Sequence, residues 1–393
     1  MLGTLYDEYI YGNGNVRSAV NRWNQTTVDN LKKKYSQDII LNGNQLSQTS
    51  LSNNKDNVIH GGGTLNITSN LNLGSGGLVF DKGHKYTVTG DNIIYTGAGI
   101  DIGENSTVDW FLKGTTNDNL HKIGAGTLNV KVSQGGNLKT GDGTVNLSAT
   151  NAFNNIYMAG GNGTVKLNAE KALSEGEYNG IFFTRNGGTL DLNGYDQSFN
   201  KIAATDSGAV ITNTADKEAK LFLKNNTNYI YHGKINGNVA IIQQHETKKE
   251  NNRLILDGEI NIQNDIRLRN TQLTMQGHAT EHAIYRDGNF SCSLPAPIRF
   301  LCGRDYVAEI QKTEADIARQ SGNIHKTSNT VSDLSQPDWE NGTFRFGTLY
   351  LENSDFSVGR NADVKGDIQS DSSNILFGDT TAFIDLHAGK NCP

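Results

Sequence analysis

Proline, cysteine and long apolar runs are all scarce in this sequence. Of its 393 residues only 4 are proline and 3 are cysteine, and hydrophobic residues make up 35%. Three cysteines exclude a disulfide framework as the main source of stability. No apolar run approaches the length of a membrane-spanning helix. With 44 glycines against so few prolines, the composition favours many tight turns and long paired strands.

Strong charge of either sign is also missing. The formal net charge is −6, and the longest basic run is Lys32-Lys33-Lys34. We therefore expect no nucleic-acid partner. Met1 leads directly into polar sequence without an apolar signal region, so we expect the natural N-terminus to lie upstream. Asn, Gly, Thr and Ser replace the missing apolar residues, which suits a fold with a narrow core and a large surface.

A short phrase recurs along the chain and is the most informative feature. It reads Gly-x-Gly-Thr followed by alternating apolar residues. Copies begin at Gly61, Gly124, Gly141, Gly161 and Gly187, with a looser relative from Asn341. The threonines at 127, 144, 164 and 189 are separated by 17, 20 and 25 positions. Repeats of about twenty residues indicate a solenoid.

Within each phrase the apolar side chains alternate with polar ones, as in Leu128 and Val130 or Val145 and Leu147. This period of two predicts strands that are buried on one side, with glycines at the corners between them. A leucine-rich repeat would need a regular leucine and asparagine pattern, and a propeller would need longer repeats. We therefore predict an all-β chain that folds as a right-handed parallel β-helix (solenoid).

Two regions interrupt this rhythm and define the predicted organisation. Residues 1–45 are predicted to form an N-terminal linker or cap with a short helix near 26–35. Residues 46–277 form the β-helix, and 341–393 continue it. Residues 278–340 are predicted to be a corner insertion with a cysteine pair and an amphipathic helix at 304–320, where Val307, Ile310 and Ile317 share a face.

Candidate site residues are few. Cys292 and Cys302 lie ten positions apart and would close a small loop as a disulfide, which would stabilise by roughly 2–3 kcal/mol. The alternative is two free thiols, and Cys392 has no assigned partner. Tyr229 and Tyr231 are candidates for stacking on sugar rings along the solenoid, although ordinary strand packing is the favoured interpretation.

Three patterns suggest a catalytic or metal-binding site, but each lacks a feature that its chemistry requires. Ser207 follows Asp206, but Thr205 stands where a chymotrypsin-like site needs the glycine that completes the oxyanion hole. His278 and His282 fit an H-x-x-E-H zinc pattern, but the periodicity around them is not helical. The calcium-like run at 97–105 is not repeated in tandem. We therefore predict no catalytic residue, no metal ligand and no cofactor.

Several stretches resemble one known family. These are IHGGGTLNI at 59–67, GAGIDIGENSTVDWFLKG at 97–114, HKIGAGTLNV at 121–130, the block at 190–214, QGHATEHAI at 276–284 and the block at 346–368. They are similar to the passenger region of the serine protease autotransporters of Enterobacteriaceae. The resemblance covers about residues 59–386, and the Cys292–Cys302 loop suggests a branch like EatA and SepA.

The resemblance implies a secreted virulence protein at the bacterial cell surface, exported across the outer membrane by a C-terminal barrel of the same polypeptide. It further implies an N-terminal serine protease domain carried on a β-helical stalk, here as a monomer. The family's Gly-Asp-Ser-Gly-Ser motif is not present, so this piece is expected to be a non-catalytic scaffold. Expected partners are the parent's own protease domain and barrel, together with a host extracellular protein or a mucin or glycan. The alternative is an adhesin-type passenger that binds host glycan or protein.

Overall fold

The computed structural model describes residues 35–177, 179–249, 252–279, 339–377 and 383–385. Two compact units divide the chain. Unit 1 comprises Met1–Ile202 and Gly208–Leu221, and unit 2 comprises Ala203–Ser207 and Phe222–Pro393. Within the described ranges, helical structure is limited to a 3-10 turn at Gln48–Ser50 and to Tyr35, the first described residue. None of the described elements is a helix long and apolar enough to span a bilayer.

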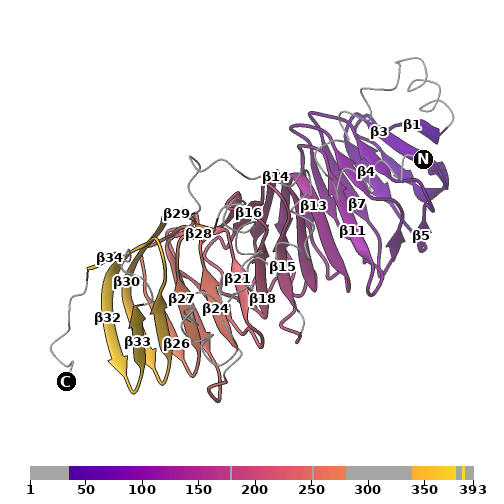
Figure 1. The fold of residues 1–393 in the computed structure, drawn as a ribbon. Helices are drawn as coiled ribbons and strands as arrows, with labels where there is room; N and C mark the ends of the chain where they lie inside the picture. Colours follow the sequence, from indigo (N-terminus) through magenta and orange to yellow (C-terminus); the bar gives the residue numbers. More distant parts are fainter. Residues whose placement is uncertain (1–34, 178, 250–251, 280–338, 378–382, 386–393) are drawn as a thin grey trace, which may run out of the picture. The chain divides into compact units, whose positions relative to one another are not determined.

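Unit 1 is built from short strands that stack in parallel on strands of the neighbouring coil (Figure 1). Its strands are β1 (Ser36–Ile40), β2 (Gln45–Ser47), β3 (Asp56–His60), β4 (Gly63–Asn66), β5 (Leu71–Asn72), β6 (Leu78–Phe80), β7 (Lys85–Thr89), β8 (Tyr95–Thr96), β9 (Ile100–Ile102), β10 (Thr107–Trp110), β11 (Asn119–Ile123), β12 (Thr127–Val130), β13 (Asn137–Leu147), β14 (Asn155–Leu167), β15 (Gly180–Phe183), β16 (Gly188–Asp191), β17 (Gln197–Phe199) and β19 (Ala209–Thr212). Two further strands, β18 (Lys201–Ala204) and β20 (Ala219–Leu223), contain residues of both units.

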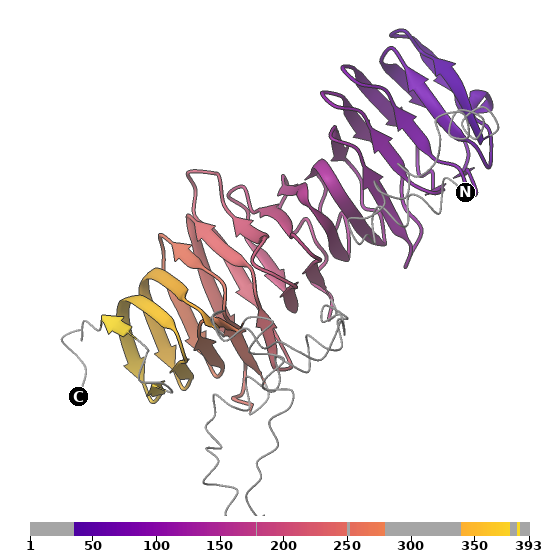
Figure 2. The ribbon, with the colours of Figure 1, turned by 45° about the horizontal axis from the view of Figure 1, so that its top comes forward.

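Unit 2 repeats the same arrangement, and Figure 2 shows its strands from a second direction. Its strands are β21 (Tyr229–Tyr231), β22 (Lys234–Gly237), β23 (Val239–Gln244), β24 (Arg253–Leu256), β25 (Ile260–Ile262), β26 (Ile266–Arg269), β27 (Gln272–Met275), β28 (His278–Ala279), β29 (Trp339–Glu340), β30 (Gly342–Glu352), β31 (Asp355–Val358), β32 (Ala362–Asp371), β33 (Asn374–Phe377) and β34 (Phe383–Asp385).

The strands of unit 2 form three parallel ladders, one on each face of the coils. β21, β24, β27, β31 and β33 pair in sequence on the first face. β22, β25 and the first parts of β30 and β32 form the second face, and β23, β26 and the last parts of β30 and β32 form the third. Three faces per coil with parallel pairing make a parallel β-helix, as the sequence predicts.

The repeated threonines mark one register position in unit 1. Thr107 pairs with Thr127, and the ladder continues through Thr144 and Thr164 to Thr189. Each spacing between these threonines is therefore the length of one coil. Strand pairing holds the position while the loop between strands varies in length, which explains the unequal spacing of the repeats.

Side chains next to these threonines fill the core. Leu128, Val145, Val165 and Leu190 are each 0% exposed and lie above one another in successive strands. The residues between them point outward and also stack: Asn146 donates to Asn129 Oδ1 at 2.8 Å. Alternation in the sequence thus becomes an apolar column inside and a polar column outside.

The first repeat departs from this register. Leu65 is 1% exposed, as its apolar pattern predicts, but Thr64 pairs with Thr87. Thr87 pairs with Asp109, which pairs with Asn129, so Thr64 lies two positions away from the level of Thr127. A shift of two residues keeps the same side chains inside, so the alternation of the sequence does not reveal it.

Corners between strands rely on asparagine as well as glycine. Among the described residues, thirteen other than glycine have a positive φ, and eleven of them are asparagine, including Asn54, Asn105 and Asn193. Asparagine tolerates the left-handed conformation because its short polar side chain can bond locally. The sequence analysis assigned the corners to glycine and missed this role.

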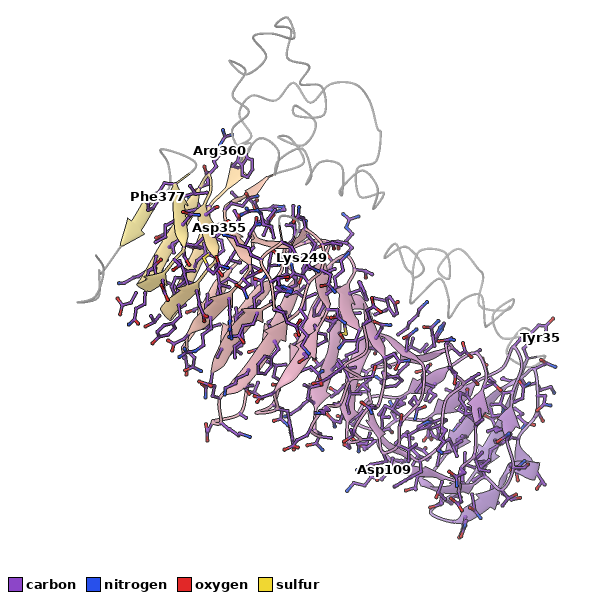
Figure 3. All side chains as sticks on the ribbon, turned by 90° about the horizontal axis from the view of Figure 1, so that it is seen from below. Tyr35, Asp109, Lys249, Asp355, Arg360 and Phe377 are labelled. Carbon is purple, nitrogen blue, oxygen red and sulfur yellow. The ribbon has the colours of Figure 1, made fainter. Side chains whose placement is uncertain are left out.

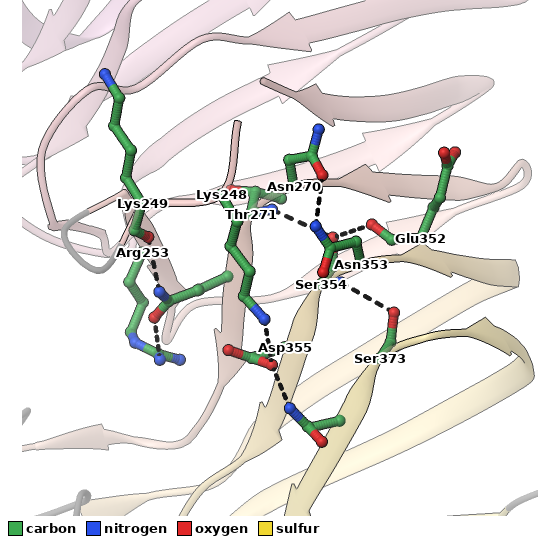
Figure 4. Close-up of polar contacts among 12 residues, drawn as sticks. Lys248, Lys249, Arg253, Asn270, Thr271, Glu352, Asn353, Ser354, Asp355 and Ser373 are labelled. Atoms are coloured by element: carbon green, nitrogen blue, oxygen red, sulfur yellow. Dashed lines mark hydrogen bonds and ion pairs between the residues drawn. The ribbon is translucent and has the colours of Figure 1, made fainter. Parts of the chain in front are cut away.

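One corner of unit 2 shows how polar side chains connect coils (Figure 4). Lys248 Nζ lies 2.8 Å from Asp355 Oδ1, and Asn353 donates to Asn270 Oδ1 at 2.8 Å. Ser354 bridges two coils, since its N–H donates to Ser373 Oγ at 2.9 Å and its hydroxyl accepts from the Thr271 N–H at 3.2 Å. These bonds satisfy polar groups that the narrow core cannot cover.

The predicted domain boundaries stay a prediction. Strand pairing begins at Ser36, where β1 pairs with β3. The helices predicted near 26–35 and at 304–320 lie outside the described residues except for Tyr35. At the second interruption, β28 pairs antiparallel with β29, with His278 opposite Glu340 and Ala279 opposite Trp339.

Candidate functional site at the first corner of unit 2

Of the predicted site residues, the structure describes Tyr229 and Tyr231, which both lie on β21. Tyr229 and Tyr231 are 4% and 0% exposed. Their rings pack inside unit 2, which agrees with the packing interpretation and leaves no open ring face for a sugar to stack on. Cys292, Cys302 and Cys392 lie outside the described residues. Ser207 is exposed in the turn between β18 and β19, a structural corner.

A site that the sequence analysis missed lies where the first face of unit 2 turns into the second. We call this the first corner and define it as residues 232–233, 257–258, 276–278 and 359–361. These residues follow β21, β24, β27 and β31, which pair in this order, so they occupy equivalent positions on successive coils. In Figure 1, β21, β24 and β27 lie side by side. The corners pack closely: a Cβ on Gly258 would overlap the carbonyl oxygens of His232 and Gly233.

His232, Asp257 and His278 meet at the first corner. His232 Nδ1 lies 2.8 Å from Asp257 Oδ1 and 2.7 Å from its Oδ2. His278 Nδ1 lies 3.0 Å from the same Oδ2. The two imidazole rings face each other edge to face, with centroids 5.2 Å apart. Both histidines therefore direct the same ring nitrogen at one carboxylate.

The carboxylate between them is completely buried. The Asp257 side chain is 0% exposed, His232 is 11% exposed and His278 is 32% exposed. Burial raises the pKa of Asp257, but the charge of His232 and its hydrogen bonds to both histidines outweigh this, so the pKa lies below the ordinary 3.8. Asp257 is ionised at neutral pH, and a buried carboxylate requires such partners.

The surroundings of His278 are acidic. Burial lowers its pKa, but the hydrogen bond and charge of Asp257, followed by the charges of Glu340 and Asp206, raise it above the ordinary 6.5. Next to this group, the guanidinium of Arg360 (labelled in Figure 3) lies 5.3 Å from the ring centre of Trp339. The Gly277 N–H donates to the Arg360 carbonyl at 2.6 Å, which fixes the backbone beside His278.

Two imidazoles and a carboxylate can hold a proton or a divalent metal ion. Their ligand atoms lie within 4.8 Å of one another, and no second group of this kind occurs among the residues that the structure describes. Of the zinc pattern in the sequence, His278 belongs to this cluster, and Glu281 and His282 lie outside the described residues. The partners His232 and Asp257 are 46 and 21 positions upstream of His278, which is why no short motif points to them.

Sequence relatives that match the whole chain are serine protease autotransporters. Serine protease EspP of Escherichia coli is 62% identical over 401 residues, which cover 99% of this chain and 31% of EspP. Serine protease EspC of Escherichia coli O127:H6 is 53% identical over 409 residues, covering 100% of this chain and 31% of EspC. The chain thus spans about a third of the length of these relatives. No protein-family model matches it.

Solved structures agree with the sequence relatives. The passenger domain of plasmid encoded toxin, an autotransporter enterotoxin of enteroaggregative Escherichia coli, superposes with a TM-score of 0.70 at 50% identity, covering 94% of this chain and 40% of that chain. The Hap adhesin of Haemophilus influenzae gives a TM-score of 0.61 at 26% identity. The match covers 82% of this chain and 35% of the adhesin chain.

Stacked parallel coils and these two passenger structures define the class: the chain is a β-helical segment of an autotransporter passenger. Within that class its sequence groups with the serine protease autotransporters, and over its whole length it is similar to EspP and EspC. The family resemblance in the sequence is confirmed, whereas the EatA and SepA branch stays a prediction. Passengers of this class are secreted or exposed at the cell surface through the outer membrane, as predicted.

Proposed function

We propose that this β-helix is the stalk that carries an N-terminal serine endopeptidase domain, in a precursor whose C-terminal barrel exports it. The observation that carries the proposal is the unbroken ladder of unit 1, in which one register position continues from Thr107 to Thr189. Such a ladder can serve as a spacer, because each coil contacts only its neighbours and the stack keeps the same register from coil to coil. The 62% identity to a serine protease over 99% of the chain supports the same role.

The role of a stalk can be tested by removing one complete coil. Gly143 pairs with Gly163 and Thr144 with Thr164, so deletion of residues 144–163 joins Gly143 to a threonine in the same register. We expect the full-length precursor with this deletion to be secreted and to keep its proteolytic activity in the culture supernatant. A geometric support tolerates a shorter stack as long as the remaining coils fit.

The matched control removes one residue fewer from within the strand, 146–164, and joins Val145 to Val165. This places two successive residues of the inward-facing set next to each other and shifts every following side chain of the strand by one position, which turns its apolar face outward. We expect secretion and folding to fail for this variant. Loss of proteolytic activity in a secreted and folded 144–163 deletion would instead show that this coil has a specific role, and would contradict a purely geometric stalk.

We further propose that residues 278–340 are a corner insertion, closed by a Cys292–Cys302 disulfide, that contacts a host extracellular protein, mucin or glycan. The antiparallel pairing of β28 with β29 supports an excursion that leaves and returns at one corner. Peptide mass spectrometry without reduction tests the disulfide, and a linked Cys292–Cys302 peptide is expected. Deletion of residues 285–338 should abolish host binding and leave secretion intact; unchanged binding would contradict the role of the insertion.

The adhesin-type alternative has weaker support. The Hap adhesin is 26% identical, compared with 50% for the passenger domain of plasmid encoded toxin. No feature of the described residues favours adhesion over a stalk. A precursor that lacks proteolytic activity in the supernatant while binding host cells would favour this alternative.

A further inference from the structure

The buried cluster at the first corner has the composition of a transition-metal site. Neutral imidazole nitrogens and a carboxylate oxygen are ligands that Zn²⁺ accepts, at roughly 2.0–2.2 Å from the metal. His232 Nδ1, His278 Nδ1 and Asp257 Oδ2 are the three atoms that converge. Two nitrogen ligands distinguish this cluster from a calcium or magnesium site, which is built from oxygen ligands.

Small movements are enough to admit an ion among these atoms. Ligand atoms around a tetrahedral Zn²⁺ lie about 3.3–3.4 Å apart, given metal–ligand distances of about 2.0–2.1 Å. The two nitrogens now lie 2.7 and 3.0 Å from Asp257 Oδ2, as donors in hydrogen bonds. Side-chain movements that open these two separations to that value, and that bring the two nitrogens, now within 4.8 Å of each other, to the same spacing, would let one metal ion replace the two bonding protons.

Charge and burial at the corner also favour a cation. Asp257 is fully buried, and the carboxylates of Asp206 and Glu340 add negative charge near His278. A divalent cation would neutralise this concentration of carboxylates more completely than one shared proton. His278, at 32% exposure, gives the cluster a side that is open to solvent and therefore a route of entry.

We propose that His232, Asp257 and His278 form a divalent transition-metal site, with Zn²⁺ as its preferred physiological ion, at the first corner of unit 2. The ion connects the coil of β21 and the coil of β24 to β28, where the chain departs into residues 280–338.

Isothermal titration of Zn²⁺ into the metal-stripped chain at pH 7.5 tests the site. The expected result is one saturable site per chain that is insensitive to excess Ca²⁺ or Mg²⁺. His232→Ala and Asp257→Asn should each weaken binding by more than about tenfold, since even supporting residues of metal sites are worth 10–100-fold. Asp257→Asn preserves the shape of the side chain while removing its charge and one acceptor oxygen, and circular dichroism checks that the variant is folded.

The matched control is His60→Ala in unit 1. His60 also contacts two carboxylates, with Nε2 2.9 Å from Asp38 Oδ1 and Nδ1 3.0 Å from Asp81 Oδ2, but these carboxylates are 74% and 28% exposed. We expect this variant to bind Zn²⁺ normally. Equal weakening by His60→Ala would show diffuse surface binding and overturn the proposal.

Two further measurements separate the alternatives. X-ray absorption at the zinc edge should show nitrogen and oxygen ligands that include two imidazoles, and loss of the signal of one imidazole in His232→Ala supports the site. Binding that depends on His282 but not on His232 would assign zinc to the H-x-x-E-H run of the sequence and overturn the proposal. Absence of any stoichiometric binding in the folded chain would overturn it as well.

Discussion

Lys122 and Asp142 lie on adjacent coils of unit 1, and the buried ammonium of Lys122 donates to the backbone carbonyl of Asp142 at 2.7 Å. The same Nζ donates to the carbonyls of Gly124 at 2.5 Å and Gly126 at 2.7 Å. The lysine is 0% exposed. Three backbone acceptors thus satisfy all three protons of a cation inside the coil, and the cation connects its own turn to the next one.

Replacing this lysine with methionine should destabilise unit 1, most clearly at alkaline pH. In Lys122→Met three carbonyls lose a donor, which costs about 1–3 kcal/mol when such groups are buried. At pH 7 the loss is smaller, because methionine avoids the cost of burying an ammonium group. Hydrogen-exchange mass spectrometry of unit 1 peptides across a urea series measures the difference.

The pH dependence follows from the pKa of Lys122. Burial lowers this pKa from 10.5 to about 8, so between these values the unfolded chain binds more protons than the folded one. Stability of the wild type should therefore rise with pH from about 8 to about 10.5 relative to the methionine variant. A difference between the two proteins that stays constant over this range would contradict the assignment.

Gly143→Ala should destabilise unit 1 more than Gly83→Ala does. Both glycines have positive φ, 66° and 81°. A Cβ on Gly143 would overlap Lys122 Nζ and the carbonyl oxygens of Gly124 and Gly126, whereas a Cβ on Gly83 meets nothing within 4 Å. Comparison of the two variants separates two effects. Both carry backbone strain of about 1 kcal/mol, and only Gly143→Ala adds steric overlap. Equal midpoints of urea unfolding for the two variants would show that overlap is relieved at no cost.

Trp110→Ala should cost about 3–5 kcal/mol, because it leaves a large cavity in the core. Trp110 is 0% exposed and packs edge to face on Tyr95, with ring centres 5.1 Å apart. Its neighbour Phe111 is 37% exposed, so Phe111→Ala serves as the control and should cost under about 1 kcal/mol. Comparable losses of stability in urea unfolding would contradict the alternation of inward and outward side chains at the end of β10.

His278→Gln should weaken unit 2 at mildly acidic pH, when measured in EDTA to exclude metals. The pKa of His278 is raised, so its contribution is fully present below 6.5 and is lost as pH rises through the folded value. The lowered pKa of Asp257 adds stability that is present above 3.8. The difference from wild type should therefore be largest between about 4 and 6.5 and fade toward pH 8.5. A difference that grows toward alkaline pH would contradict this.

Much of the fold could be predicted because the repeats encode it locally. Alternation around Thr127, Thr144, Thr164 and Thr189 determines which side chains face inward, and the structure places these threonines in one ladder. The register of Thr64 could not be predicted in the same way, since a two-residue shift leaves the alternation unchanged. Lys122 was also missed, because a lone lysine gives no signal that three carbonyls surround it.

The sequence by itself determined the alternation within the repeats, the length of the coils between Thr127 and Thr189, and the family, because all three depend on residues that are close together in the chain or on recognisable stretches. Tertiary structure alone decided the first corner of unit 2. His232, Asp257 and His278 are separated by 25 and 21 positions, and they meet only because the coils of β21, β24 and β27 bring equivalent corners together. Variable coil length hides this proximity from any fixed spacing, so the pairing of the strands had to be known before the cluster could be seen.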